Sequence, residues 1–175
     1  MTSVMKAARV FWFTGLAGAG KSAIGRRFFE RLQTQYANSV FLDGDRMREV
    51  FGDDLGYARE ERLQSAMRNS RLCRMLSDQG ILVVCATISL LHECQRWNRK
   101  HIPGYREIYV RAPMAVLARR DPKALYSRAQ RGEIRNVVGV DIAAEEPERP
   151  DLILDNDGSR SVGELAETAW LRLQS

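Results

Sequence analysis

The sequence predicts an α/β fold in which one parallel sheet of about five strands carries helices on both faces. Short apolar runs alternate with helical patterns along the chain, which is typical of right-handed crossovers between parallel strands. The first run, residues 10–13, is apolar on both of its faces, as a central strand requires. The chain has 175 residues, the size of one domain. We therefore expect residues 1–175 to form a single domain.

Each expected element follows from a local pattern. In the first helix, apolar residues are spaced four apart from Ile24 to Leu32, which forms a stripe on one face. Gly80 is placed to end the longest helix, and Ser161 with Glu164 makes a capping box at the start of the last one. The expected strands are 10–13, 39–42, 81–86, 105–110 and 151–154. The expected helices are 22–35, 46–51, 60–79, 90–101, 113–119 and 161–173.

A glycine-rich turn follows the first expected strand and satisfies G-x-x-x-x-G-K-[ST], the phosphate-binding loop. Glycines let the backbone bend until several N–H groups face one anion, and the next helix adds the positive end of its dipole. Lys21 is placed to reach the β- and γ-phosphates of ATP, and Ser22 to bind Mg²⁺. A chance Lys-Ser is the alternative, but the strand–loop–helix context favours nucleotide binding. The loop reads Gly15-Leu16-Ala17-Gly18-Ala19-Gly20-Lys21-Ser22.

Two carboxylates, Asp43 and Asp45, flank Gly44 directly after the second expected strand. Ligands gather at the carboxyl ends of the strands in open parallel sheets, so this turn is expected to face the phosphate-binding loop. One carboxylate would bind Mg²⁺ through water, and the other would accept a proton from an attacking hydroxyl group. A polar turn that caps the next helix is the alternative. Beside the phosphate-binding loop, the catalytic interpretation is favoured.

Cationic side chains follow in two regions. Arg48 and Arg62 carry guanidinium groups that match phosphate or sulfate oxygens in pairs. Residues 121–141 are charged and have no clear period, which predicts a mobile lid with a short helix. A cationic lid that closes over ATP would stabilise charge on the transferring group and exclude water. Solvated arginines and a solvated surface loop are the alternatives. The cations of the lid region are Arg119, Arg120, Lys123, Arg128, Arg131 and Arg135.

Composition narrows the class of protein. Hydrophobic residues make up 45% of the chain and charged residues 28%, which is typical of a soluble globular domain. No apolar run is long enough to span a bilayer, and residues 1–9 are too short for a signal peptide, so a cytoplasmic location is expected. The net charge of +5 favours anionic ligands, but no basic run interleaved with aromatic residues points to nucleic acid. The three cysteines form no C-x-x-C pair, which argues against a metal site and a disulfide framework.

Taken in order, these motifs resemble those of the adenylylsulfate kinase family, over Val10 to about Leu154. Leu42-Asp43-Gly44-Asp45 with Arg48 is similar to the family's D-G-D-N-x-R. Asp54-Leu55-Gly56-Tyr57 is similar to D-L-G-F, with Arg62 at the arginine that follows it. Ile88-Ser89 lies at the family's F-I-S-P. Arg120-Asp121-Pro122-Lys123 with Leu125-Tyr126 and Ala129 is similar to R-D-x-K-G-L-Y-x-x-A, and Gly132-Glu133-Ile134 and Gly139-Val140-Asp141 complete the lid pattern.

The resemblance implies ATP with Mg²⁺ as the phosphoryl donor and the ribose 3′-hydroxyl of an anionic nucleotide as the acceptor. It implies that Asp45 is the base and that Asp43 helps Ser22 to order Mg²⁺. Arg120 would join the phosphate-binding loop in holding ATP. Relatives in this family are often dimers, so a homodimer is compatible with the resemblance. The implied acceptor-binding residues are Asp43, Arg48, Tyr57, Arg62, Ser65, Ile88, Ser89, Lys123 and Val137.

Departures from the family pattern cluster on the acceptor side. In the family, the ring at Tyr57 and a lid phenylalanine clasp the adenine of the acceptor, and this phenylalanine falls on Val137. Base–aromatic stacking is worth about 1–3 kcal/mol per base, and valine cannot replace it. The family's asparagine after the second arginine falls on Ser65. The segments 87–89 and 136–141 resemble a smaller branch, similar to kinases of cytidine diphosphoramidate, used in making capsular polysaccharide.

The expected function is therefore phosphorylation of adenylyl sulfate or a closely related nucleotide, with cytidine diphosphoramidate as the alternative acceptor. The acceptor base and its terminal group, sulfate or phosphoramidate, stay open. A catalytically silent module that regulates a partner enzyme is a second alternative, against which the base candidate Asp45 argues. A nucleic-acid-associated NTPase is a third, and no second basic domain supports it.

Overall fold

The computed structural model describes residues 10–173, except for the side chain of Pro122. The five expected strands form one sheet in the order β2-β3-β1-β4-β5, and every pairing is parallel. Each strand lies within one residue of its expected bounds, so the predicted fold class is confirmed. The strands are β1 Val10–Thr14, β2 Ser39–Asp43, β3 Leu82–Ala86, β4 Tyr105–Arg111 and β5 Leu152–Asp155.

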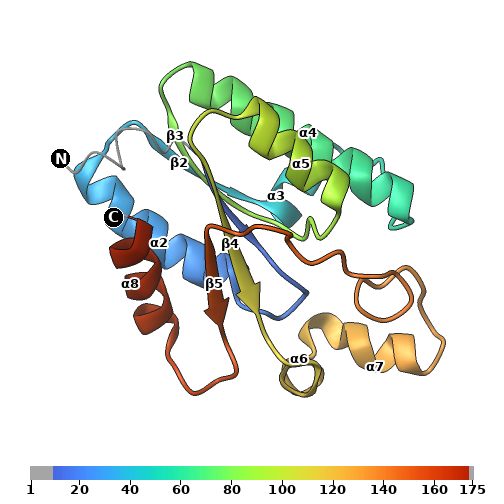
Figure 1. The fold of residues 1–175 in the computed structure, drawn as a ribbon. Helices are drawn as coiled ribbons and strands as arrows, with labels where there is room; N and C mark the ends of the chain where they lie inside the picture. Colours follow the sequence, from blue (N-terminus) through green and yellow to red (C-terminus); the bar gives the residue numbers. More distant parts are fainter. Residues whose placement is uncertain (1–9, 174–175) are drawn as a thin grey trace.

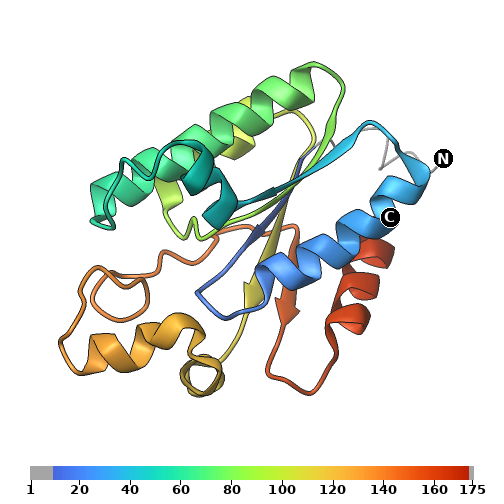
Figure 2. The ribbon, with the colours of Figure 1, turned by 180° about the vertical axis from the view of Figure 1, so that it is seen from behind.

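Helices cover both faces of the sheet, with α2 and α8 on one face and α4 and α5 on the other (Figures 1 and 2). Helix α3 begins two residues earlier than expected, because the side chain of Asp43 caps it. Helix α5 begins two residues later, because Leu90 and Leu91 are buried in the loop before it. The helices are α2 Lys21–Gln35, α3 Gly44–Val50, α4 Arg59–Asp78, α5 His92–His101, α6 Met114–Arg120, α7 Leu125–Gln130 and α8 Val162–Leu173, with a 3₁₀ turn at Pro122–Ala124.

The core divides into two layers because side chains alternate along each strand. In the fully buried β1, Phe11 and Phe13 face the layer under α2 and α8, whereas Val10 and Trp12 face the layer under α4 and α5. Phe28 of α2 packs its ring between those of Phe11 and Phe13, with centroids at 4.9 and 5.5 Å. This packing fixes α2, and with it the loop that enters α2, against the centre of the sheet.

The carboxyl ends of the strands meet at one edge of the molecule. There the phosphate-binding loop follows β1, Asp43 ends β2, and residues 87–91 follow β3. Helices α6 and α7 of the lid region lie at the same end of the sheet (Figure 1). The expected convergence of the motifs on one rim is therefore present. Within residues 10–173, no helix is long and apolar enough to cross a membrane; the expectation about a signal peptide concerns residues 1–9, outside the described part.

Candidate active site

The glycines of the phosphate-binding loop are required by close approach as well as by the turn. A Cβ atom on Gly15 would lie 2.2 Å from the carbonyl oxygen of Val110, so β4 leaves no room for a side chain there. Gly20 has φ of 98°, and its Cβ would lie 2.6 Å from Nδ2 of Asn156. The loop thus packs against β4 at Gly15 and against the segment after β5 at Gly20.

Four side chains donate hydrogen bonds to four consecutive carbonyl groups of this loop, those of residues 16–19. This satisfies the acceptors of the loop and leaves the first N–H groups of α2 available to an anion. Two of the donors come from the lid region and one from the segment after β5, so distant parts of the chain set the shape of the loop. The four bonds are Lys21 Nζ to Leu16 O (2.8 Å), Tyr126 Oη to Ala17 O (2.7 Å), Arg120 Nη1 to Gly18 O (3.1 Å) and Asn156 Nδ2 to Ala19 O (2.8 Å).

The ammonium group of Lys21 is almost completely buried, with 8% of the residue exposed. Burial lowers the pKa of Lys21 to about 8, and the charges of Asp45 and Asp43 oppose this shift. Both carboxylates therefore lie close enough to Lys21 to act on its charge. The expected meeting of the loop and the Asp43–Asp45 turn is present.

Asp43 has two roles in the structure that the sequence left as alternatives. One carboxylate oxygen accepts from the backbone N–H of Asp45 at 3.1 Å and caps α3, while the other accepts from Ser22 Oγ at 2.6 Å. Gly44 permits this turn because a Cβ there would lie 2.8 Å from Oγ1 of Thr87. One carboxylate therefore caps a helix and also pairs with the hydroxyl group expected to bind Mg²⁺.

Asp45 is exposed and paired with the lid. Its Oδ2 accepts from Lys123 Nζ at 3.0 Å, and this bond raises the pKa of Lys123. Two of the other expected lid cations, Arg128 and Arg131, both pair with Glu133, at 3.5 and 2.5 Å. Among the expected lid cations, Lys123 bonds Asp45 and Arg120 bonds the carbonyl of Gly18 at the rim.

The acceptor side is built around the ring of Tyr57, which is 53% exposed. The guanidinium groups of Arg48 and Arg62 lie 4.3 and 5.2 Å from the centroid of this ring. Arg48 also donates to Asp53 and Gly56, and Arg62 donates to the carbonyl groups of Tyr57 and Asn136. Burial lowers the pKa of Arg62, although guanidinium stays charged. The two arginines thus hold the expected aromatic platform, and Arg62 ties it to the lid.

Three expected acceptor residues lie deeper than the sequence suggested. Ser89 is fully buried, and its hydroxyl accepts from Trp12 Nε1 at 2.7 Å and pairs with Thr14 Oγ1 at 3.1 Å. Ile88 packs against a small apolar cluster. Val137 is 2% exposed and packs in the core layer of α2. In this conformation the buried side chains of Ser89 and Val137 support the site from within the core. Ser65, half-buried on α4, stays a prediction.

Four residues that shape the site were not among the predicted site residues, although Tyr126 and Asp141 lie in the lid motifs that the sequence showed. Tyr126 and Asn156 hold the phosphate-binding loop, and Asp141 accepts from the N–H groups of Asn136 and Val137 at 2.6 Å each. Asn156 comes directly after β5, so the rule that ligands gather at strand ends would have identified it. Glu145, considered below, lies in a segment without a recognisable pattern.

The fold and the site define a phosphotransferase built on a phosphate-binding loop. The sequence profile of the adenylylsulphate kinase family matches residues 7–155. The chain belongs to this family and is an ATP-dependent kinase with an alcohol group as acceptor.

Relatives with different acceptors in their names are similarly close to this chain. A cytidine diphosphoramidate kinase of Campylobacter jejuni is 41% identical over 158 residues, which are 90% of this chain and 92% of the relative. An adenylyl-sulfate kinase of Vibrio cholerae is 39% identical over 158 residues, 89% of this chain and 73% of the relative. An APS kinase of Mycobacterium tuberculosis, solved in complex with AMPPNP and APS, has a TM-score of 0.86 and 34% identity, covering 97% of this chain and 99% of that one.

Proposed function

We propose that this protein transfers the γ-phosphoryl group of MgATP to the ribose 3′-hydroxyl of adenylyl sulfate or a closely related nucleotide, and that cytidine diphosphoramidate is the preferred acceptor. The meeting of Lys21, Ser22, Asp43 and Asp45 at one edge of the sheet carries the proposal of the reaction. In this proposal residues 1–175 act as one kinase domain in the cytoplasm, as a homodimer without a nucleic-acid partner, with residues 121–141 as the lid.

The proposed roles follow from the chemistry of each group. Phosphoryl transfer needs positioning and neutralisation of charge more than covalent help from the protein. Lys21 stabilises the charge of the transferring group, and Asp45 accepts the proton of the attacking hydroxyl. Lys123 holds the carboxylate of Asp45 toward the lid. Arg48 and Arg62 bind the anionic part of the acceptor.

The residues present also fit a magnesium ion. Mg²⁺ prefers oxygen ligands and is usually held by one or two protein groups together with phosphate oxygens and water. Ser22 and Asp43 offer a hydroxyl and a carboxylate oxygen 2.6 Å apart beside the phosphate-binding loop. When bound, the ion neutralises charge on the β- and γ-phosphates.

The structure of the lid favours cytidine over adenine in the acceptor. The lid supplies no ring opposite Tyr57, because Val137 stands at the position of the family's phenylalanine and is buried. A pyrimidine has less stacking area to lose than a purine.

A comparison of kcat/KM for the two acceptors, with MgATP in excess, tests the proposal. We expect a higher value for cytidine diphosphoramidate, and a higher value for adenylyl sulfate would contradict the preference. Lys21→Ala should abolish turnover with either acceptor. Asp45→Asn should lower kcat far more than it raises the acceptor KM. ADP release that depends on neither acceptor would instead favour the nucleotide-binding module.

A further inference from the structure

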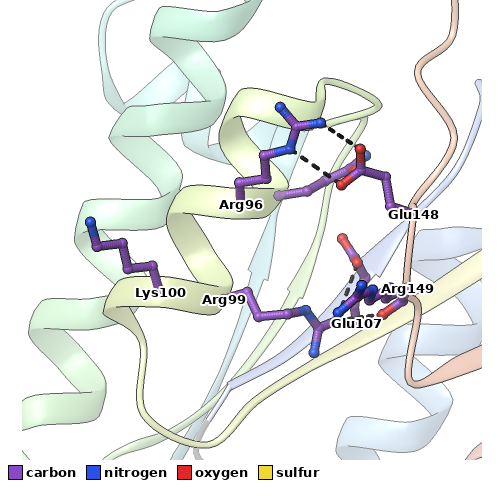
Figure 3. A pocket seen from close by; sticks show the side chains of 7 residues that line it. Arg96, Arg99, Lys100, Glu107, Glu148 and Arg149 are labelled. Carbon is purple, nitrogen blue, oxygen red and sulfur yellow. Dashed lines mark hydrogen bonds and ion pairs between the residues drawn. The ribbon is translucent and has the colours of Figure 1, made fainter.

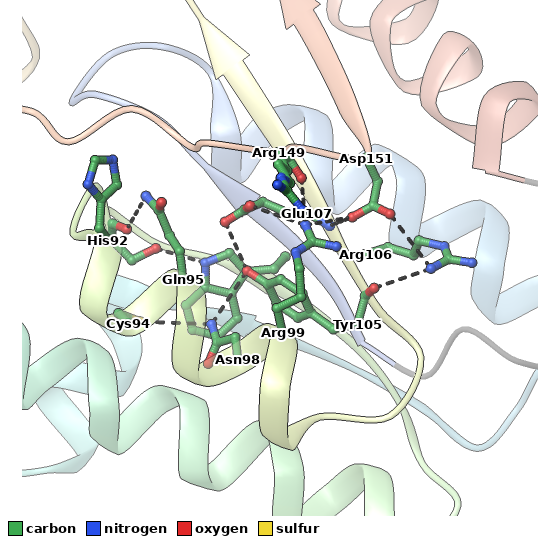
Figure 4. A network of polar contacts seen from close by, with 12 residues as sticks. His92, Cys94, Gln95, Asn98, Arg99, Tyr105, Arg106, Glu107, Arg149 and Asp151 are labelled. Atoms are coloured by element: carbon green, nitrogen blue, oxygen red, sulfur yellow. Dashed lines mark hydrogen bonds and ion pairs between the residues drawn. The ribbon is translucent and has the colours of Figure 1, made fainter.

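The chain segment between the lid and β5, residues 142–151, forms hydrogen bonds and ion pairs along one face of α5. We call it the return segment. The α5 residues that bind it are spaced i, i+3, i+4 and i+7, which places them on one side of the helix. The segment lies beside α5 in Figure 4, and the bonds join it along most of its length. They are His92 to Glu145 and Glu146, Gln95 to Glu145, Arg96 to Glu148, and Arg99 to Arg149 and Asp151.

Two of these six contacts, Arg96–Glu148 and Arg99–Asp151, are ion pairs between partly exposed side chains. Arg96 and Glu148 pair across an open groove of about 620 Å³, in which Arg99 also contacts the buried Glu107 (Figure 3). Both side chains of the Arg96–Glu148 pair remain about half exposed or more. Such pairs typically contribute about 0–1 kcal/mol.

Glu145 differs from the rest of the segment, since four bonds join it to three other elements. Its N–H donates to the carbonyl of Leu90 at 3.0 Å, and its carbonyl accepts from Gln95 Nε2 at 2.9 Å. One carboxylate oxygen accepts from the N–H of His92 at 2.6 Å, which caps α5 and suits the helix dipole. The other accepts from Arg59 Nη2 at 2.7 Å. These bonds lower the pKa of Glu145, so the carboxylate is ionised near neutral pH.

Two of the elements that Glu145 joins, α4 and the loop after β3, carry expected acceptor residues. Arg59 is the first residue of α4, one turn before Arg62. Leu90 directly follows Ile88 and Ser89 in the loop between β3 and α5. The return segment itself continues from the lid loop, whose Asn136 carbonyl binds Arg62. The carbonyl groups of the phosphate-binding loop are bonded by Lys21, Tyr126, Arg120 and Asn156, so Glu145 is not among the side chains that hold them.

We propose that Glu145 is a positioning residue for the acceptor, an inference that rests on the proposed function. Its carboxylate fixes the start of α4, the loop after β3 and the return segment in one arrangement. Arg62 and the lid loop are then already in the positions that bind the acceptor before the acceptor arrives. Loss of the charge leaves a single acceptor oxygen for the N–H of His92 and the side chain of Arg59, and the acceptor must then order these parts itself.

The test compares Glu145→Gln with Glu148→Gln, which removes a carboxylate three residues further along the same segment. Steady-state rates give the KM for the acceptor and the KM for ATP separately, with cytidine diphosphoramidate and adenylyl sulfate each used as acceptor. We expect Glu145→Gln to raise the acceptor KM about tenfold while the ATP KM changes less than about twofold. Glu148→Gln should leave both values unchanged. Equal effects on the two KM values, or none, would overturn the proposal.

Hydrogen exchange separates this inference from the proposed function. In Glu145→Gln, the amide of His92 and the amides at the start of α4 should exchange faster, whereas the phosphate-binding loop should not change. Unchanged exchange at those amides would contradict the positioning role by itself. If the wild-type protein phosphorylates neither acceptor, the proposed function fails, and the exchange result still decides whether Glu145 orders this side of the molecule.

Discussion

Lys21 shows how one buried residue couples binding to protonation. Its folded-state pKa of about 8 lies below its ordinary value of 10.5, because burial removes the ammonium group from water. Below pH 8 the group is charged in both the folded and the unfolded protein, so the cost of burying the charge is fully present. As pH rises from about 8 to 10.5, the folded protein loses this proton first, and the contribution of Lys21 to stability increases.

ATP should reverse this shift, since its phosphates place negative charge beside Lys21. At pH 8 about half of the protein carries the proton before binding, so we expect ATP to bind with uptake of about half a proton. Titration calorimetry in buffers of different ionisation enthalpy measures this number. Lys21→Arg is the control, because guanidinium is already charged at pH 8 and should remove the uptake. An equal uptake in both proteins would assign it to other groups.

At the scale of elements, the entry to the lid is held in an unfavourable backbone conformation. Asp121, Lys123 and Ala124 have positive φ values of 24°, 60° and 52°. Left-handed conformations cost residues with a Cβ atom about 1–2 kcal/mol each. Asp121 offsets part of this cost, since its carboxylate accepts from the N–H groups of Tyr126 and Ser127 and caps α7. Ala124 occupies the position of the glycine in the family's lid motif R-D-x-K-G-L-Y.

Ala124→Gly should therefore stabilise the protein, although glycine usually destabilises. Relief of the left-handed strain should outweigh the extra freedom of the unfolded chain, for a gain of about 0.5–1 kcal/mol. In a chain of this size we expect a rise in Tm of about 2–4 °C per kcal/mol, measured by calorimetry. Ala118→Gly, in the exposed part of α6, is the matched control and should lower stability by about 1 kcal/mol. A lower Tm for both variants would show that the strain at Ala124 is absent in solution.

The bond from Tyr126 to the carbonyl of Ala17 is expected to support ATP binding by the phosphate-binding loop. Tyr126→Phe removes the bond to Ala17 and keeps the ring, at a cost of about 1 kcal/mol. We expect the KM for ATP to rise about fivefold with the acceptor KM unchanged, the opposite of the pattern expected for Glu145→Gln. Tyr36→Phe, at the end of α2, should change neither value. A rise confined to the acceptor KM would remove Tyr126 from the ATP side.

Sequence patterns reached the elements and motifs but not the contacts between them. The strands, the phosphate-binding loop and the Asp43–Asp45 turn are local, because apolar periodicity and turn chemistry set them within a few residues. The bond from Asn156 to Ala19 spans 137 positions, and no local pattern records it. The burial of Val137 was not predicted, for the same reason. Val137 lies in a charged segment without periodicity, and the packing of the lid on the core decides its burial.

At the scale of the whole molecule, helix α2 contributes one end to the candidate active site and its middle to the hydrophobic core. Helix α2 begins with Lys21 at the rim and continues to Phe28, which is 1% exposed and packs against Phe11, Phe13 and Trp170. The sheet therefore carries the site at its carboxyl edge, and the aromatic core of its α2 face begins two turns away.

Phe28→Leu tests this division. Loss of the ring contacts should destabilise the protein by about 1–3 kcal/mol, because the leucine fills only part of the space. If the core supports the helix without adjusting the loop, the KM for ATP should stay within about twofold of wild type. ATP at 100 times its Kd should then add about 2.7 kcal/mol to both proteins, so thermal unfolding with and without ATP should show equal increments. A smaller increment in the variant would mean that Phe28 transmits its packing along α2 to Lys21, and that the core helps to shape the phosphate-binding loop.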